Sequence, residues 1–169
     1  MRMIKNIFIL LACSFLSGAT CKYSFKDTSP IPVEVKTFRV NYLENKAAYV
    51  NTRLSPELTE RLKEKIIRTT RLKQTNDADA HYDISGYVSQ YAVSTVGITN
   101  QAAAGNRLSV SFHLEFKNTL DAKKNFDADI LRTFDFPGTQ TLAQAESSLN
   151  ADIVRNLVDE IFNKIFSNW

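Results

Sequence analysis

Histidine, glycine and cysteine are scarce in this 169-residue chain, and each shortage excludes a class of chemistry. The two histidines, His81 and His113, do not have a metal-ligand spacing such as His-Glu-x-x-His. The five glycines are dispersed, so they do not form a glycine-rich loop that holds phosphate. The sequence also shows no catalytic triad. It therefore predicts a protein that is not an enzyme and that binds no metal or cofactor.

The chain also lacks an apolar run long enough to cross a membrane as a helix, which takes about 20 residues. Its one marked run, Ile7–Leu16, follows the basic residues Arg2 and Lys5 and precedes the small residues Ser17–Thr20. This order is typical of a secretory signal peptide, so we assign residues 1–20 to one.

Neither sign of charge is in large excess once that segment is set aside. Residues 1–20 contain two of the 21 basic residues and no acid, so 19 basic and 18 acidic residues remain in the rest of the chain. A nearly neutral domain without a basic stripe or an RNA-binding motif is not typical of nucleic-acid-binding proteins. We expect no nucleic-acid partner. The hydrophobic share of 44% and the charged share of 23% are those of one soluble domain.

Both cysteines lie near the predicted cleavage site, so they bear on processing of the chain. Cys13 lies within the apolar run and would be removed with the signal peptide, which would leave Cys21 alone and exclude an internal disulfide. A lone cysteine directly after the small residues of a signal peptide is typical of a bacterial lipoprotein, in which the thiol is acylated. We predict lipidation at Cys21, with residues 21–32 as the lipidated N-terminus and tether.

Two alternatives remain open for this N-terminus. Residues 18–20 lack the aliphatic residue that usually stands three positions before an acylated cysteine, and the Leu-Leu-Ala-Cys of residues 10–13 fits the usual pattern better. Acylation at Cys13, however, would leave only Ile7–Leu11 as the apolar segment, shorter than the usual length of about 7–15 residues. The second alternative is an ordinary cleaved signal peptide that leaves Cys21 as a free thiol.

Apolar periodicity predicts the elements of a single domain over residues 33–169. Alternation predicts four strands, and a spacing of three to four residues predicts two helices. Ser55 is predicted to cap the free backbone N–H groups at the start of the first helix, and Pro56 is suited to the first helical position. The strands are predicted at residues 32–42, 81–93, 107–117 and 125–136, the helices from Ser55 onward and at Leu142–Ser167, and a long mobile hairpin loop at Ser94–Asn106.

The order of these elements is β-α-β-β-β-α. Each helix has one apolar face, and both faces can be buried only against the apolar side of the sheet. The predicted fold class is therefore α+β: a two-layer sandwich, with a four-stranded sheet and two helices on one face.

The opposite face of this sheet would be polar and uncovered. A face of this kind is either solvated or a surface for a partner, and tyrosine is enriched at protein interfaces. We take Tyr87, Tyr91 and His113 as partner-surface candidates. The polar face is predicted to carry Asp83, Ser85, Tyr87, Ser109, Ser111, His113, Glu115, Lys117, Asp127 and Asp129.

Four segments together resemble the lipopolysaccharide-assembly lipoprotein family, LptE. They are "CKYSF" after the signal peptide, "LSPELTERLKEKIIRTTRLKQTNDADAHYDISGYVSQY", "RLSVSFHLEF" and "FDFPGTQTLAQAESSLNADIVRNLVDEIFNKI". The most specific of these is "DAHYDISGYV", which lies where the family typically has an Ala-Asp-x-x-Ile-x-Gly type of pattern that enters a strand. The resemblance covers nearly the whole of the chain after residue 20.

The resemblance implies an outer-membrane lipoprotein, anchored on the periplasmic side, that plugs the β-barrel translocon LptD, assists its assembly and helps lipopolysaccharide (LPS) reach the cell surface. It also implies contact with LPS through basic residues. The alternative is a lipoprotein that carries a lipid by its acyl chain in the periplasm. The candidates for contact with LPS phosphates are Arg107, Lys117, Lys123, Lys124 and Arg132.

Overall fold

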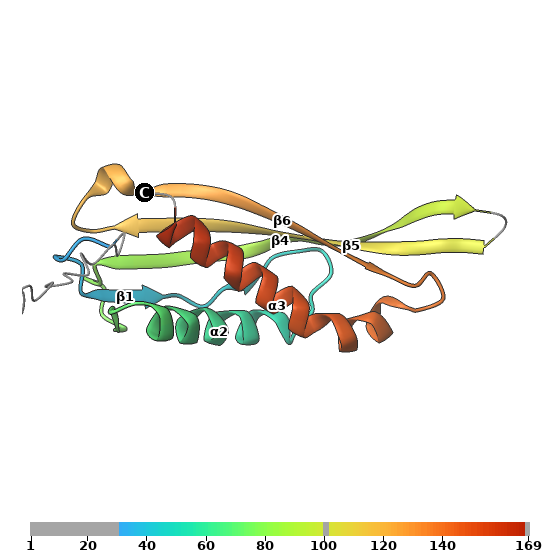
Figure 1. The fold of residues 1–169 in the computed structure, drawn as a ribbon, viewed down its shortest axis with the longest axis horizontal. Coiled ribbons are helices and arrows are strands. Elements are labelled where there is room, and N and C mark those ends of the chain that lie inside the picture. The colour runs from blue at the N-terminus through green and yellow to red at the C-terminus, as the bar shows by residue number, and fades with distance from the viewer. Residues whose placement is uncertain (1–30, 100–101, 168–169) are drawn as a thin grey trace, which may run out of the picture.

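A computed structural model describes residues 31–99 and 102–167 (Figure 1). The predicted signal peptide, Cys13, Cys21 and most of the predicted tether lie outside these residues. Within them, no helix combines the length and the apolar content that crossing a membrane requires.

Within the described residues, six strands form one mixed sheet. They span Thr37–Val40 (β1), Glu44–Asn45 (β2), Lys73–Gln74 (β3), Tyr82–Thr99 (β4), Ala102–Asn118 (β5) and Phe126–Phe136 (β6). The order is β3-β1-β4-β5-β6, and β2 pairs with β4 beyond the end of β1. β4, β5 and β6 pair antiparallel, whereas β1 and β2 pair with β4 in parallel.

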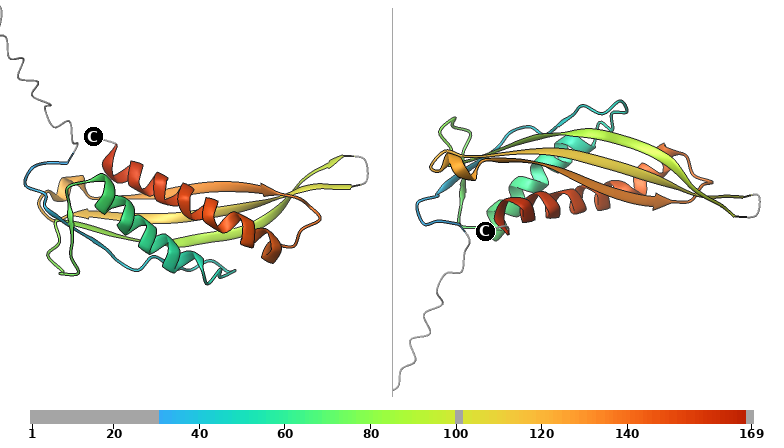
Figure 2. Two further views of the ribbon diagram at one scale, coloured as in Figure 1. Left: turned by 60° about the horizontal axis from the view of Figure 1, so that its bottom comes forward. Right: turned by 90° about the horizontal axis from the view of Figure 1, so that it is seen from above.

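In the part of the chain that the structure describes, two helices lie on one face of this sheet and leave the other face open (Figure 2). α2 spans Leu54–Thr69, α3 spans Leu142–Phe166, and a short 3-10 helix, η2, spans Ala122–Lys124 between β5 and β6. The predicted layering, α+β with both helices on one face, is confirmed. The predicted bounds of the last helix agree with α3 within a residue.

The core lies between the helices and the even-numbered residues of β5. Leu108, Val110, Phe112, Leu114 and Phe116 are each exposed by 1% or less, as the alternation predicts. Burial of a large apolar side chain stabilises the fold by about 1.5–3 kcal/mol. The interior between the layers is therefore filled with side chains.

The predicted number of four strands is wrong, because the sheet has six. The two missed strands, β2 and β3, have two residues each, too few to show alternation. The first predicted strand, residues 32–42, is also shorter in the structure, where β1 covers Thr37–Val40. Its outer apolar residues, Val33 and Tyr42, are exposed.

The predicted loop at Ser94–Asn106 is also corrected. β4 and β5 continue as a paired hairpin through Ile98↔Ala103 and Thr99↔Ala102, so most of this segment is strand. Figure 1 shows this hairpin extending past the helices and past β6.

α2 begins at Leu54, and its N-cap is Arg53, whose side chain makes no capping hydrogen bond. The Ser55 side chain lies buried within the first turn, so the predicted cap is wrong.

Candidate functional site

The open face of the sheet carries an ordered row of side chains across four strands. Glu44 of β2 pairs with Tyr87 of β4, Tyr87 with His113 of β5, and His113 with Asp129 of β6. The centroids of the Tyr87 and His113 rings are 5.2 Å apart. His113 Nδ1 lies 2.7 Å from Asp129 Oδ1. The row therefore joins β4, β5 and β6 by side-chain contacts, and the strand register places Glu44 of β2 beside Tyr87.

A charged pair, Lys46 and Glu44, and an exposed apolar side chain, Leu131, also lie on the open face. Lys46 Nζ lies 4.4 Å from the centroid of the Tyr87 ring and 3.3 Å from Glu44 Oε2. A cation over an aromatic face is attracted by the ring quadrupole. On β6, Leu131 projects from the same face and is 56% exposed. A single exposed leucine is ordinary on a protein surface, so the indication of a protein-binding surface comes from the aromatic side chain of the row.

Two bidentate ion pairs flank the open face. Arg39 Nε and Nη2 donate to Asp83 Oδ1 and Oδ2 over 3.0 and 2.8 Å, and these bonds lower the pKa of Asp83. Asn41 Nδ2 donates a further bond of 2.7 Å to Asp83. Near the hairpin, Arg107 makes the equivalent pair with Asp135 and lowers the pKa of that carboxyl. Both pairs fix neighbouring strands in register.

Tyr91 is not on the open face, although the sequence pattern places it there. The pairing shifts by one residue between Val88 and Gln90, so a β-bulge lies at Ser89. Because an extra residue reverses the alternation, the side chain of Tyr91 faces the core and is only 4% exposed. The sequence does contain a signal for the bulge. Val88 and Tyr91 are three residues apart, whereas residues on one face of a regular strand are two or four apart.

Tyr91 instead belongs to a polar cluster beneath the start of α3. Its ring stacks on Tyr49 with centroids 5.6 Å apart, and its hydroxyl accepts a bond from Asn51 Nδ2. Tyr49 Oη donates to Glu146 Oε2 over 3.1 Å. Burial raises the pKa of Tyr91 well above its ordinary value. The cluster therefore holds the segment before α2 against α3.

The five basic LPS candidates are spread over separate parts of the domain. Arg107 and Lys117 occupy opposite ends of the open face on β5, about 33 Å apart at 3.3 Å per residue. Lys123 and Lys124 lie in η2. The turn before η2 is held by Asn118, whose side-chain oxygen accepts hydrogen bonds from the backbone N–H groups of Leu120 and Asp121. Arg132 faces the helix layer and pairs with Glu160 of α3. The structure therefore does not bring these five residues together.

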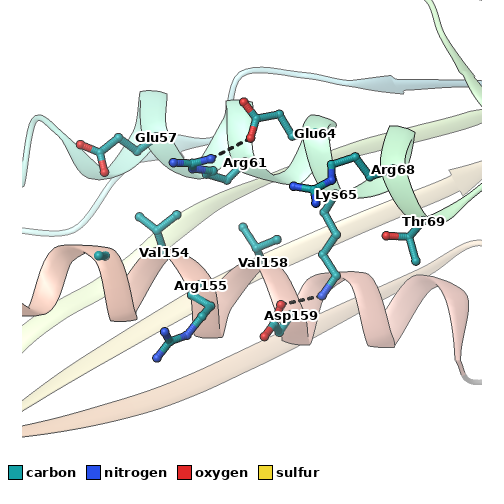
Figure 3. Close-up of a pocket in the computed structure, with 11 residues that line it drawn as sticks. Glu57, Arg61, Glu64, Lys65, Arg68, Thr69, Val154, Arg155, Val158 and Asp159 are labelled. Carbon is teal, nitrogen blue, oxygen red and sulfur yellow. Dashed lines mark hydrogen bonds and ion pairs between the residues drawn. The ribbon is translucent and has the colours of Figure 1, made fainter.

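A groove of about 560 Å³ separates the outer surfaces of α2 and α3 (Figure 3). Its floor includes Val154 and Val158, and its walls carry charged side chains from both helices. Lys65 crosses it to Asp159, with Nζ 2.5 Å from Oδ1. The groove is therefore a charged surface feature rather than an apolar hollow. Within the described residues, no three metal-ligating side chains gather to form a site.

Comparison with known proteins supplies the family. The model of the LptE family, described as lipopolysaccharide-assembly, matches residues 35–165. The chain belongs to this family. The match spans most of the chain and confirms the resemblance predicted from the four sequence segments. LptE-family membership assigns this chain to lipopolysaccharide assembly at the level of the family. Among curated protein sequences, no relative matches the chain.

Solved structures show that the LptE-type fold recurs at low sequence identity. A minor lipoprotein from Acinetobacter baumannii is 17% identical, with a TM-score of 0.54 over 79% of this chain and 94% of that one. Lipoprotein B from Nitrosomonas europaea is also 17% identical, with a TM-score of 0.51 over 81% and 89%. A hypothetical protein from Chlamydia trachomatis has a TM-score of 0.51 at 7% identity over 79% and 99%. At these identities the likeness concerns the fold alone.

Proposed function

We propose that this protein is a non-enzymatic outer-membrane lipoprotein of LPS transport that plugs an LptD-type β-barrel and assists its assembly. The observation that carries the proposal is the family match over residues 35–165, which spans every strand and helix of the domain apart from the last residue of α3. The protein acts as a partner of the barrel and helps deliver LPS to the cell surface.

The open sheet face is the surface that we assign to the barrel partner. The lumen of a large outer-membrane barrel is polar, so a plug needs a polar surface with a few larger anchors. The open face offers this combination in the Tyr87–His113 row and the exposed Leu131. The outer helix surface differs, because the groove between α2 and α3 is lined by charged and small side chains and, among the described residues, by no aromatic ring.

The alternative of a lipid carrier needs an apolar cavity for an acyl chain. The space between the layers is filled by buried rings, among them Phe38, Phe112 and Phe116. The groove between α2 and α3 is walled by charged side chains. Neither place suits an acyl chain, so the packing favours the barrel partner.

Depletion in the source cell tests the proposed role in transport. We expect surface LPS, measured by labelling of intact cells, to fall as the protein is depleted and to recover when the full chain is supplied again. Undiminished surface LPS after depletion would show that the protein has no part in transport.

Mass analysis of the mature N-terminus tests the proposed anchor. Lipidation predicts acyl chains on Cys21 and cleavage directly before it, which would hold the domain on the periplasmic side of the outer membrane. Acyl chains on Cys13 would move the start of the tether upstream. An N-terminus without acyl chains would refute lipid anchoring while leaving partner binding to be judged by the pull-down described below.

A further inference from the structure

The hairpin that projects beyond the domain has two open backbone edges. We name residues 92–99 of β4 and 102–106 of β5 the distal ribbon. On the β4 side, pairing ends where Asn45 of β2 meets Val88, and the last backbone bond to that edge is from Lys46 N to Val88 O. On the β5 side, pairing with β6 ends at Asn106↔Phe136. Beyond these points, and within the part of the chain that the structure describes, the two strands pair only with each other.

The distal ribbon lacks the protection that exposed strand edges usually have. Natural edges carry charges, prolines, bulges or a covering element, because an unprotected edge is a template for another strand. No charged residue and no proline occurs anywhere from Ile84 to Asn106, and the one register shift lies before Gln90. Val93 is 41% exposed, and β-branched residues are frequent in the segment. Its composition thus favours strand pairing and offers nothing that prevents it.

The unpaired backbone N–H and C=O groups at the edge of the ribbon distinguish a lipid from a protein as the molecule that covers it. An uncharged surface is suited to a site from which water is excluded. Both a lipid and a protein would exclude water from the ribbon. An open strand edge in hydrocarbon, however, leaves N–H and C=O groups unsatisfied at several kcal/mol each, so open edges do not occur in lipid. An extended polypeptide satisfies those groups by adding a strand. A two-stranded ribbon is also only marginally stable in water, and a third strand stabilises it.

We propose that the distal ribbon binds an extended, uncharged segment of the barrel partner by β-strand addition along the open edge of β4. The inference rests on the proposed function for the identity of the partner, and the strand geometry defines the mode of binding. Main-chain hydrogen bonds supply the affinity, and the lack of charge on the ribbon selects an uncharged strand.

Hydrogen exchange of backbone amides tests the binding mode directly. The full chain is purified in mild detergent with its barrel and compared with the full chain alone. We expect amides within residues 92–97 to exchange at least about tenfold more slowly in the complex, because strand addition gives them new acceptors. Amides of β5 between Leu108 and Phe116 serve as the internal control, since both edges of that segment are already paired.

The exchange result separates this inference from the proposed function. A complex that contains the barrel but shows unchanged exchange in the ribbon would overturn strand addition alone. Failure to recover any barrel would overturn the proposed function and this inference with it. Protection that appears in the chain alone on raising its concentration, or on adding anionic phospholipid vesicles, would identify a second copy or a lipid surface as the occupant and overturn the inference.

A charge-insertion variant supplies the second test. The double substitution Val93→Lys and Thr95→Lys places two cations on exposed positions of the ribbon, where they protect an edge against pairing. We expect recovery of the barrel to fall about tenfold, which corresponds to about 1.4 kcal/mol. The matched control is Val33→Lys, which adds a cation at a position 78% exposed and outside the ribbon. Equal recovery with both variants would contradict the proposal.

Discussion

At Gly86 the backbone of β4 lies so close to β5 that a single added methyl group has no room. A Cβ atom there would lie 2.3 Å from the backbone oxygen of His113 and 2.6 Å from Cζ of Phe112. The Phe112 ring covers the space that a side chain would fill. The close approach therefore makes glycine a requirement of the core beneath the Tyr87–His113 row.

We expect Gly86→Ala to lower the free energy of unfolding by about 3 kcal/mol, because the ring and the strand must both shift to admit the methyl group. Chemical denaturation of the described domain checks this. Gly105→Ala is the matched control, since its nearest non-neighbouring atom is 3.6 Å away, an ordinary contact. Equal losses for the two variants would refute the steric account.

The Arg39–Asp83 pair predicts a pH-dependent contribution to stability. Its hydrogen bonds hold the pKa of Asp83 below its ordinary value of about 4. A lowered folded-state pKa means that the contribution is full above about pH 4 and is lost as the pH falls through the folded-state pKa. We expect Asp83→Asn to cost about 1 kcal/mol at neutral pH, with a difference from wild type that shrinks in acid.

Asp135→Asn is the control for that experiment. Asp135 makes the same bidentate pair with Arg107, but its side chain is 62% exposed against 17% for Asp83, so solvent screens the pair more strongly. Unfolding curves at pH 7 and pH 3 should show the smaller effect for Asp135→Asn. A loss of stability for Asp83→Asn that is the same at both pH values would contradict the assigned cause.

At the scale of elements, the two helices begin in different ways. Thr141 caps α3, with its hydroxyl accepting a bond from Gln144 N and the Gln144 side chain accepting one from Thr141 N. This capping box satisfies two amide groups that the helix itself leaves free. The N-cap of α2, Arg53, supplies no such side-chain bond.

We therefore expect Thr141→Ala to lower the free energy of unfolding by about 1 kcal/mol. Arg53→Ala should cost less, because no cap is lost and only a surface pair with Glu57 is removed. Thermal unfolding followed by circular dichroism measures both. If Arg53→Ala proved the more costly change, the assignment of the α3 cap would be wrong.

Elements whose apolar pattern repeats over many residues were predictable from sequence, whereas very short strands and the strand with a bulge were not. β5 and α3 each repeat their apolar pattern over many residues, so local signal and burial agree. β2 and β3 depend on tertiary pairing alone. Residues 94–106 were interpreted as a loop because the alanines and glycine of residues 102–105 favour strands weakly, although the β-branched residues before them favour strands. The bulge at Ser89 moved Tyr91 to the core, whereas Tyr87 and His113 lie on the open face as predicted.

At the scale of the whole molecule, the two outer surfaces are predicted to differ in partner binding. Leu131 on the open face and Ile67 on α2 are exposed to similar extents, 56% and 50%. An exposed position tolerates substitution, so neither Leu131→Arg nor Ile67→Arg should change stability by more than about 0.5 kcal/mol. We expect Leu131→Arg to reduce recovery of the barrel about tenfold and Ile67→Arg to leave it near wild type. The reverse order would assign the partner surface to the helix layer.

Partner recovery tests the central claim most directly. The tagged full chain is isolated from membranes in mild detergent, and the proteins that accompany it are identified by mass. Membership of the LptE family and the open polar face predict that a large LptD-type β-barrel is recovered with it. Recovery of the chain without any barrel, under conditions that keep outer-membrane proteins folded, would contradict the account.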